Sequence, residues 1–225
     1  MVFCYAISMN IDWIFFDVGG VLSDESRYFN FRVNIDLNII KNYKPEVTRQ
    51  DILNIWPKIS AIQSELDESV FRWFIPEKAD EAIAEMRERK KSGPPYTEQQ
   101  QIRPEAAAVA YELSKKYKLG LIANQHNAIK EKLTTAGVLK YFQHTSISDD
   151  YKLEKPNPEI FRITLNEVGA DASSSVMIDD NIERSLIPAK QIGMTTVWYQ
   201  LEDRDVQGNI VDYKIRSLND LLSIF

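Results

Sequence analysis

The 225-residue sequence contains a single cysteine, Cys4, and only two histidines. One thiol cannot form a disulfide within the chain, so nothing in the sequence calls for an oxidising compartment. No run of apolar residues approaches the roughly 18 to 20 that a membrane-spanning helix needs. The sequence therefore indicates neither a disulfide-stabilised scaffold nor a transmembrane segment.

An excess of positive charge is also missing, because 33 acidic residues outnumber 27 basic ones and leave a net charge of −6. Proteins that bind the phosphate backbone of nucleic acids usually carry a basic face, so we expect no nucleic-acid partner. Residues 1–7 are apolar but lack a basic leader and an obvious cleavage site. We expect a cytoplasmic protein without a membrane partner, whose natural start lies near Met9.

The composition that is present, 44% hydrophobic and 27% charged residues, is ordinary for a globular protein. The first clear structural signal is the continuous apolar run at residues 14–16, which is typical of a strand buried on both faces of a parallel sheet. The run ends in Asp17, and Gly19 and Gly20 then allow a tight turn and a close approach to a ligand. Asp17 is a candidate for chemistry, although a carboxylate here also caps ordinary turns.

The segment from residue 23 to residue 101 has helical patterning and few strand signals. Thr48 precedes a run in which Ile52, Ile55 and Ile59 recur at helical spacing, as expected of a capped amphipathic helix. The aromatic residues of the segment are expected to pack inside it, because helical spacing usually reflects core packing. This pattern predicts a helical cap inserted into a larger core.

From Pro104 onward, segments with strand and helix patterns alternate. The predicted strands lie at residues 118–124, 144–148, 175–178 and 195–198, and the predicted helices at 106–116, 128–136, 158–168 and 182–192. Short links between such segments predict an α/β fold with a doubly wound parallel sheet. We expect residues 9–22 and 102–225 to form this core and residues 23–101 the helical cap.

Polar residues stand at the ends of the predicted strands and before one helix: Asp17, Asn124, the pair Asp179 and Asp180, and Lys155. Each has an ordinary interpretation, because aspartate favours helix N-caps and asparagine favours turns. The segment Glu154–Pro158 also fits a turn that feeds a helix. Taken together, however, three converging carboxylates need a cation among them, and Mg²⁺ favours oxygen ligands of this kind.

The string Phe16–Leu22 resembles the nucleophile motif of the haloacid dehalogenase-like (HAD) hydrolase superfamily, and the later segments resemble its remaining motifs in the same order. The likeness covers nearly the whole chain and is greatest to helical-cap members such as sugar phosphatases and the N-terminal phosphatase of epoxide hydrolases. It implies a Rossmann-like core and a Mg²⁺-dependent phosphatase. Such an enzyme cleaves a small phosphorylated metabolite through an aspartyl-phosphate, as a monomer or homodimer.

The resemblance also implies roles for the residues that match the motifs. Asp17 is expected to be the nucleophile and a metal ligand, together with the carboxylate of Asp180 and the carbonyl of Gly19. Related phosphatases usually carry a second aspartate, the general acid, at the position of Gly19. Losing a general acid typically costs a factor of about 10² to 10⁴ in rate, and least when the leaving group is good. We therefore expect a preference for acyl, anomeric sugar or aryl phosphates.

The remaining matched residues are expected to bind the phosphoryl group. By the same resemblance, Lys155 neutralises that group and orients Asp17, with Asp179 as the salt-bridge partner of the lysine. The amide of Asn124 and the residue Gly20 are expected to contact the phosphoryl oxygens. Asn124 is the last residue of the predicted strand 118–124, and Gly20 comes four positions after the apolar run 14–16.

Three residues are candidates for replacing the missing general acid. Asp24 and Glu25 stand at the entry to the cap, and His126 follows Asn124 closely. All three also fit an interpretation as solvated surface residues. Sequence alone does not choose between these interpretations.

Two other functions stay open at this point. A degenerate relative that binds phosphate or a partner without catalysis is favoured by Gly19 and by Ala123, which replaces the usual serine or threonine. A 2-haloacid dehalogenase-like hydrolase would use the same nucleophile without a metal. The pair Asp179 and Asp180 favours the metal-dependent phosphatase over both.

Overall fold

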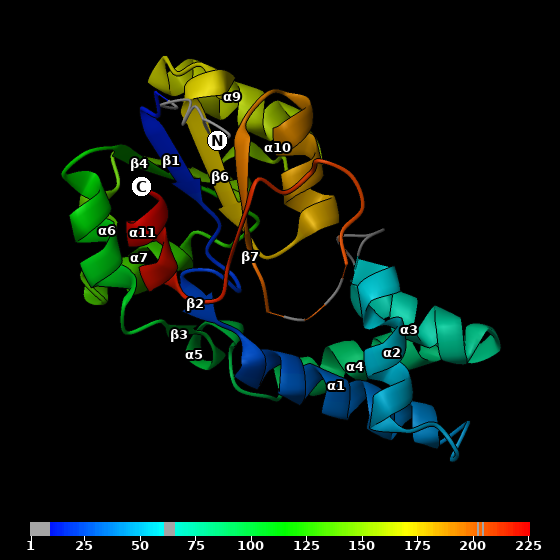
Figure 1. Cartoon of the computed structure of the whole chain (residues 1–225). Coiled ribbons are helices and arrows are strands. Elements are labelled where there is room, and N and C mark those ends of the chain that lie inside the picture. Colours follow the sequence, from blue (N-terminus) through cyan, green and yellow to red (C-terminus); the bar gives the residue numbers. More distant parts are fainter. Residues whose placement is uncertain (1–9, 61–65, 202, 204) are drawn as a thin grey trace. The chain divides into compact units, whose positions relative to one another are not determined.

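A computed structural model describes residues 10–60, 66–201, 203 and 205–225 of the chain (Figure 1). The apolar residues 1–7 and Met9, where the sequence predicted an extension and a natural start, lie outside the described residues. The chain forms two compact units. One is Ser23–Gln101, and the other joins the part of the chain before Ser23 to Ile102–Phe225.

The larger unit is built on a six-stranded parallel sheet with the order β5-β4-β1-β6-β7-β8 (Figure 1). Its strands are β1 (Trp13–Phe16), β4 (Lys118–Ala123), β5 (His144–Ile147), β6 (Ser175–Asp179), β7 (Thr195–Tyr199) and β8 (Tyr213–Ile215). Strand β1 pairs with β4 on one side and β6 on the other, so the strand order reverses beside it. Doubly wound sheets bind ligands at the carboxyl ends of such strands. The predicted α/β fold is confirmed.

Two layers of helices cover the sheet, and β1 contributes to both interfaces (Figure 1). Ile14 and Phe16 pack in a buried cluster with α6 (Ala106–Ser114), α7 (Ala128–Thr135) and α11 (Leu221–Ile224). Trp13 and Phe15 pack in a second cluster with α9 (Glu159–Val168) and α10 (Ile187–Gln191). Because successive side chains of a strand point to opposite faces, a strand covered on both faces needs an unbroken apolar run.

Several short elements of the larger unit have no distinct signal in the sequence. They are η2 (Leu139–Tyr141), α8 (Ser148–Tyr151), η3 (Ala172–Ser174), η4 (Ile182–Leu186) and η5 (Leu218–Asp220). The helix predicted at residues 182–192 is in fact a π-helical turn, η4, followed by α10. Pro188 lacks an N–H and stands in the first turn of α10, where no intrahelical donor is needed.

The smaller unit is helical and has its own buried core. Its elements are β2 (Ser23–Asp24), α1 (Ser26–Lys41), α2 (Arg49–Ser60), α3 (Leu66–Phe74), η1 (Pro76–Lys78), α4 (Ala79–Lys91) and α5 (Tyr96–Gln99), and β3 (Gln101–Ile102) begins at its last residue. Thr48 and Asp51 cap α2 reciprocally, since the backbone N–H of each residue donates to the side chain of the other, at 2.8 and 3.2 Å.

The aromatic residues of the smaller unit were predicted to pack inside it. Phe71 is buried in the core, but Trp73 is 55% exposed, so the prediction was wrong for Trp73.

Within the described residues, no helix is both long enough and apolar enough to cross a membrane.

Candidate active site

The carboxyl ends of β1 and β6 bring three acidic residues together. Asp17 follows β1 directly, Asp179 is the last residue of β6, and Asp180 comes next. The backbone N–H of Asp17 donates to the carbonyl of Ile178 at 2.9 Å, which places the two strand ends side by side. One carboxylate oxygen from each of the three aspartates lies within 4.8 Å of the others. Such a donor set is suited to a hard divalent cation.

The ammonium of Lys155 lies between two of these carboxylates. Its Nζ is 2.6 Å from Oδ2 of Asp179 and 2.9 Å from Oδ1 of Asp17. The side chains of Lys155 and Asp179 are fully buried and that of Asp17 is 5% exposed. Burying charges is costly unless they are paired and hydrogen-bonded, so the three groups depend on one another.

The buried charges shift one another's proton affinities. Burial raises the pKa of Asp17 to about 6, with the Asp179 carboxylate adding to the rise and the Lys155 ammonium opposing it. Burial also acts to raise the pKa of Asp179, but the cations of Lys155 and Arg184 and the hydrogen bonds to it bring the pKa below its usual value. Asp179 therefore stays ionised at neutral pH, while Asp17 titrates nearer to neutrality.

The pKa of Lys155 moves in the opposite sense from that of a typical buried lysine. Burial acts to lower it, but the carboxylates of Asp17 and Asp179 outweigh that effect and the pKa is raised. The lysine consequently keeps its charge across the physiological range. It is a fixed positive charge beside the carboxylate of Asp17.

Asn124, which follows β4, holds the backbone from which this lysine projects. Its Nδ2 donates to the carbonyl of Lys155 and its Oδ1 accepts the N–H of Lys155, each at 2.8 Å. The peptide bond between Lys155 and Pro156 is cis. Of the two hydrogens on the Asn124 side-chain amide, one donates to the Lys155 carbonyl. The predicted contact to a phosphoryl oxygen would use the other hydrogen.

The loop after Asp17 passes directly over the carboxylate of Asp180. Gly20 has a φ of +75°, and a Cβ at this position would lie 2.4 Å from Oδ2 of Asp180. Both the backbone conformation and the lack of space require glycine here. Gly19 lies between Asp17 and Gly20, and the role of its carbonyl as a metal ligand stays a prediction.

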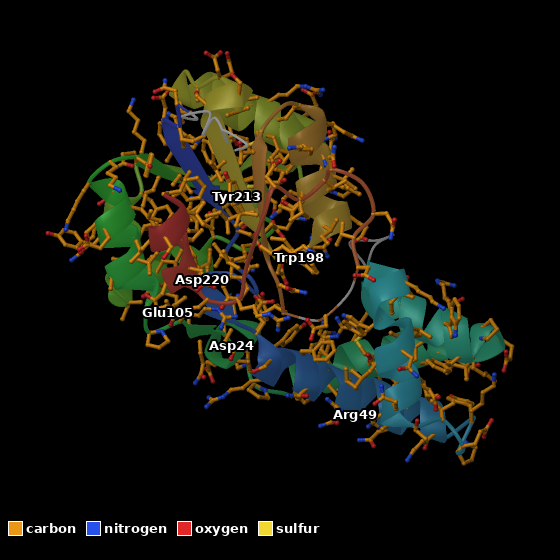
Figure 2. All side chains as sticks on the ribbon, in the orientation of Figure 1. Asp24, Arg49, Glu105, Trp198, Tyr213 and Asp220 are labelled. Carbon is orange, nitrogen blue, oxygen red and sulfur yellow. The ribbon has the colours of Figure 1, made fainter. Side chains whose placement is uncertain are left out.

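The acidic pair is held by groups that the sequence did not single out. Trp198, whose side chain is labelled in Figure 2, lies near the end of β7. Its indole Nε1 donates to the backbone carbonyl of Asp180 at 3.0 Å. The N–H of Asn181 donates to Oδ1 of Asp179 at 2.8 Å, and the Asn181 side chain caps η4 by accepting the N–H of Arg184. Trp198 is the last residue of a predicted strand. A tryptophan at a buried strand end needs an acceptor for its indole N–H, and this need was the one feature of the sequence that pointed to such a contact.

Asp24 and Glu25, two of the candidates for replacing the general acid, accept hydrogen bonds from other residues of the smaller unit. Oδ1 of Asp24 accepts the N–H of Ser26 at the start of α1, at 2.8 Å. Oε1 of Glu25 accepts hydrogen bonds from the hydroxyl of Tyr96 and from Nε2 of Gln100. Both carboxylates thus contribute to the local structure of that unit.

His126 and Ala123 lie at and beyond the end of β4. The His126 side chain is 76% exposed, and its Nε2 lies 3.6 Å from Oδ2 of Asp149. Its Nδ1 accepts the N–H of Ala128 at 3.3 Å, as a helix-start side chain commonly does. Ala123 is buried and brings no hydroxyl to the site.

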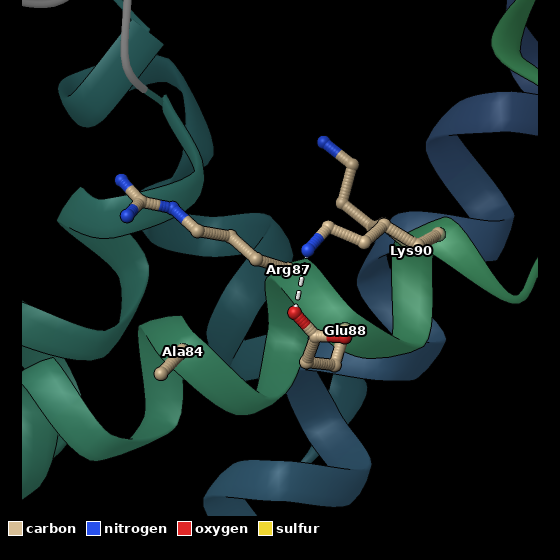
Figure 3. A pocket seen from close by; sticks show the side chains of 5 residues that line it. Ala84, Arg87, Glu88 and Lys90 are labelled. Atoms are coloured by element: carbon tan, nitrogen blue, oxygen red, sulfur yellow. Dashed lines mark hydrogen bonds and ion pairs between the residues drawn. The ribbon is translucent and has the colours of Figure 1, made fainter.

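A separate hollow lies on the surface of α4 (Figure 3). It is lined by Ala84, Arg87, Glu88, Lys90 and Lys91. Lys91 pairs with Glu88 at 2.6 Å, Arg87 pairs with Glu68, and Lys90 lies over the ring of Tyr28. Because these cations have acidic or aromatic neighbours, the hollow is an ordinary solvated surface.

Comparison with known proteins identifies similar sequences and folds. The profile of the haloacid dehalogenase-like hydrolase family matches residues 11–193. The glyceraldehyde 3-phosphate phosphatase of Pyrococcus abyssi (strain GE5 / Orsay) is 35% identical over 86 residues, which cover 37% of this chain and 36% of that relative. The pyrophosphatase PpaX of Bacillus velezensis is 26% identical over 231 residues, 94% of each chain. This chain therefore aligns with little more than a third of the first relative and with nearly all of the second.

Solved structures resemble the chain over almost its whole length. An HAD phosphatase from Thermococcus onnurineus has a TM-score of 0.62 at 26% identity, covering 95% of this chain and 97% of that one. The haloacid dehalogenase-like family protein SP0104 from Streptococcus pneumoniae has a TM-score of 0.67 at 16% identity, covering 96% and 99%. The second likeness concerns the fold alone.

Proposed function

Because this chain belongs to the haloacid dehalogenase-like hydrolase family, we propose that it is a phosphatase that acts on a small phosphorylated metabolite with the help of Mg²⁺. The observation that carries the proposal is the cluster of Asp17, Asp179 and Asp180 with their carboxylate oxygens within 4.8 Å, held by a buried lysine. Relatives named as phosphatases support it. The assignment of residues 9–22 and 102–225 as the core and residues 23–101 as its cap is part of the proposal.

The contacts of the three carboxylates indicate which of them would hold the metal. Both oxygens of Asp179 already accept hydrogen bonds, one from Lys155 and one from the N–H of Asn181. Asp17 uses Oδ1 for Lys155 and can present Oδ2, and the Asp180 carboxylate lies against the loop at Gly20. Asp17 and Asp180 are thus the proposed protein carboxylates of the Mg²⁺ site, with the Gly19 carbonyl beside them.

Bound Mg²⁺ would neutralise charge on the phosphoryl oxygens, and the chain itself supplies the nucleophile. A carboxylate oxygen of Asp17 attacks phosphorus in line with the leaving oxygen, the bond to that oxygen breaks, and the alcohol oxygen departs with the electron pair. Water then hydrolyses the aspartyl-phosphate and restores Asp17. Lys155 holds Asp17 in orientation and favours its ionised form throughout.

The leaving-group preference expected from the sequence belongs to the same proposal. Gly19 supplies no acid to protonate the departing oxygen. The carboxylates of Asp24 and Glu25 take part in hydrogen bonds of the smaller unit. Substrates whose leaving groups are stable as anions, such as acyl, anomeric sugar and aryl phosphates, are therefore favoured.

A non-catalytic phosphate-binding protein of the same fold is the second candidate. It is favoured by Gly19 and by the buried Ala123, which removes a hydroxyl from the site. The intact arrangement of Asp17, Lys155 and Asp179 favours turnover instead.

The deciding experiment is hydrolysis of a panel of small phosphate esters with Mg²⁺ and with a chelator. We expect activity that the chelator abolishes and that Asp17→Asn removes. Asp12→Asn, which changes an exposed carboxylate just before β1, is the matched control and should keep full activity. Binding of Mg²⁺ and of a phosphate mimic such as beryllium trifluoride, without hydrolysis of any ester in a broad panel, would identify the non-catalytic candidate.

A further inference from the structure

Arg103 holds the loop that follows the nucleophile. Its Nε donates to the carbonyl oxygen of Val21 and its Nη2 to that of Gly20, each at 2.9 Å. The backbone N–H of Arg103 donates to the carbonyl of Leu22, also at 2.9 Å. One residue thus occupies three successive carbonyls of the loop that carries Gly20 past Asp180.

The guanidinium is itself held against the sheet. Its Cζ lies 4.8 Å from the ring centroid of Tyr199, the last residue of β7, and the tyrosine is only 3% exposed. An arginine stacked on an aromatic ring keeps its planar fork of donors in one orientation, unlike a flexible ammonium. Arg103 therefore links the loop at Gly20 and Val21 to a rigid strand.

The position of this loop matters because it has no room to move toward the acidic pair. A Cβ on Gly20 would already overlap the carboxylate of Asp180. Asp17 lies three residues before Gly20, so a shift of the loop changes the geometry between Asp17 and Asp180. A displacement of about 1 Å at a reacting group can cost about 100-fold in rate.

The backbone of Arg103, as well as its side chain, is bonded to this loop. The larger unit is interrupted after Leu22 and resumes at Ile102, so Arg103 is the second residue after the chain re-enters it. Its N–H bond to the Leu22 carbonyl joins the outgoing and returning segments at this point. The loop is consequently fixed at the end that is farther from Asp17.

We propose that Arg103 is a positioning residue of the catalytic centre, which sets the geometry of the nucleophile loop by binding the carbonyls of Gly20 and Val21 and stacking on Tyr199. It acts through the backbone and touches no reacting atom. This inference rests on the proposed phosphatase function for its kinetic consequences, but its structural consequence is independent of that function.

The kinetic test compares Arg103→Gln, Arg103→Lys and the control Arg162→Gln. Arg162 is an exposed residue of α9 whose partner is Glu159, so its loss leaves the site intact. We expect Arg103→Gln to lower kcat by about 10- to 100-fold with little change in KM, since misplaced groups slow the chemical step. Arg103→Lys should be intermediate, because one ammonium cannot reproduce the two-pronged contact and its stack.

The structural test is amide hydrogen exchange of the peptide that contains residues 17–22. Faster exchange in Arg103→Gln and in Tyr199→Leu than in the unmodified protein and Arg162→Gln is the expected result. If the unmodified protein hydrolyses no phosphate ester, the proposed function fails while the exchange data still decide the role of Arg103. A folded Arg103→Gln protein with unchanged kcat and unchanged exchange would overturn the proposal, even if its melting temperature fell. If Arg103→Gln does not fold, kcat and amide exchange measured on Arg103→Lys decide the proposal instead.

Discussion

The indole N–H of Trp198 donates to the backbone carbonyl of Asp180, at 3.0 Å. Trp198 is 1% exposed and pairs in register with Asp179 on the neighbouring strand β6. A buried indole N–H needs a partner, and this partner is the peptide bond between Asp180 and Asn181, directly after the acidic pair. The end of β7 therefore holds the acidic pair from one face of the sheet, while Tyr199 packs in the cluster on the other face.

Replacing Trp198 by phenylalanine should weaken Mg²⁺ binding. The variant keeps an aromatic side chain but loses the donor to Asp180, and a hydrogen bond of this kind contributes about 1 kcal/mol, or about fivefold in affinity. Isothermal titration of the metal-free protein with Mg²⁺ measures the change. Trp13→Phe is the control, because Trp13 is buried in the same cluster and stacks on Phe15. Equal metal affinities for the two variants would contradict a positioning role for Trp198.

Replacing Lys155 by methionine should destabilise the protein strongly and abolish hydrolysis. The substitution leaves Asp17 and Asp179 buried without the cation between them, and breaking such a pair costs about 3 to 5 kcal/mol in the free energy of unfolding. Urea unfolding without metal measures this cost.

Lys190→Met is an informative control for that experiment. Lys190 also forms a 2.6 Å ion pair, with Asp212, but both side chains are about a third exposed. Partly exposed pairs contribute less than about 1 kcal/mol, so this variant should unfold nearly as the unmodified protein does. Similar losses in both lysine variants would show that burial does not decide the cost.

Binding of Mg²⁺ should release protons in mildly acidic solution. Burial raises the pKa of Asp17 to about 6, so the metal-free protein holds a proton there near pH 5.5, and a cation favours the ionised carboxylate. Near pH 8, Asp17 is already ionised and release should be negligible. Titration calorimetry in buffers of different ionisation enthalpy measures the number of protons.

The same pKa shift has a defined sign for folding. Because the folded state binds this proton more tightly than the unfolded chain, the contribution of Asp17 to stability is greatest below the pKa of the unfolded state and is lost as the pH rises through about 6. Asp17→Asn should remove both the proton release and this dependence, whereas Asp12→Asn should leave both unchanged. Proton release that persists in Asp17→Asn would assign the titrating group elsewhere.

Replacing Gly20 by alanine should abolish activity without unfolding the protein. The new Cβ would overlap Oδ2 of Asp180, so the loop or the carboxylate must move, and we expect a loss of at least about 100-fold in kcat/KM. Gly137→Ala is the matched control, because Gly137 has a similar φ of +70° but nothing within 4 Å of the added atom. That control pays only the backbone strain of about 1 to 2 kcal/mol and should remain active. Comparable activities of the two variants would show that contact with Asp180 is unimportant.

Hydrolysis should depend steeply on the leaving group. Without an acid at the position of Gly19, kcat/KM for an aryl phosphate should exceed that for a hexose 6-phosphate by at least about 10-fold. The measurement is a series of aryl phosphates of graded phenol pKa, with a hexose 6-phosphate beside them. Equal kcat/KM values across that series would require a general acid from another residue.

Much of the larger unit could be predicted from the sequence because its strands and helices carry long, regular patterns. The apolar run at residues 14–16 predicted a strand covered on both faces, and the structure places β1 between two buried clusters. Strands β2, β3 and β8 were not predicted, since each has only two or three residues. A pattern of period two cannot be recognised over so short a length.

Strand ends also pointed to the polar residues of the candidate site, because parallel strands bring their carboxyl ends to one edge of a sheet. Asp17 and Asp179 stand 162 positions apart in the sequence, and only strand pairing brings them to the same ammonium. Spacing could not reveal Trp198 or Arg103, whose partners are backbone carbonyls of other segments. Every residue has a backbone carbonyl, so the sequence does not indicate which carbonyls accept these hydrogen bonds.

The sequence by itself determined the parallel sheet, the helical nature of the inserted segment and the identity of the groups able to do chemistry, since these follow from local periodicity and residue type. Tertiary structure alone decided the distances between Asp17, Lys155 and Asp179, their burial, and the raised pKa of Asp17. Electrostatic interactions depend on separation and on access to water, and both are properties of the folded chain.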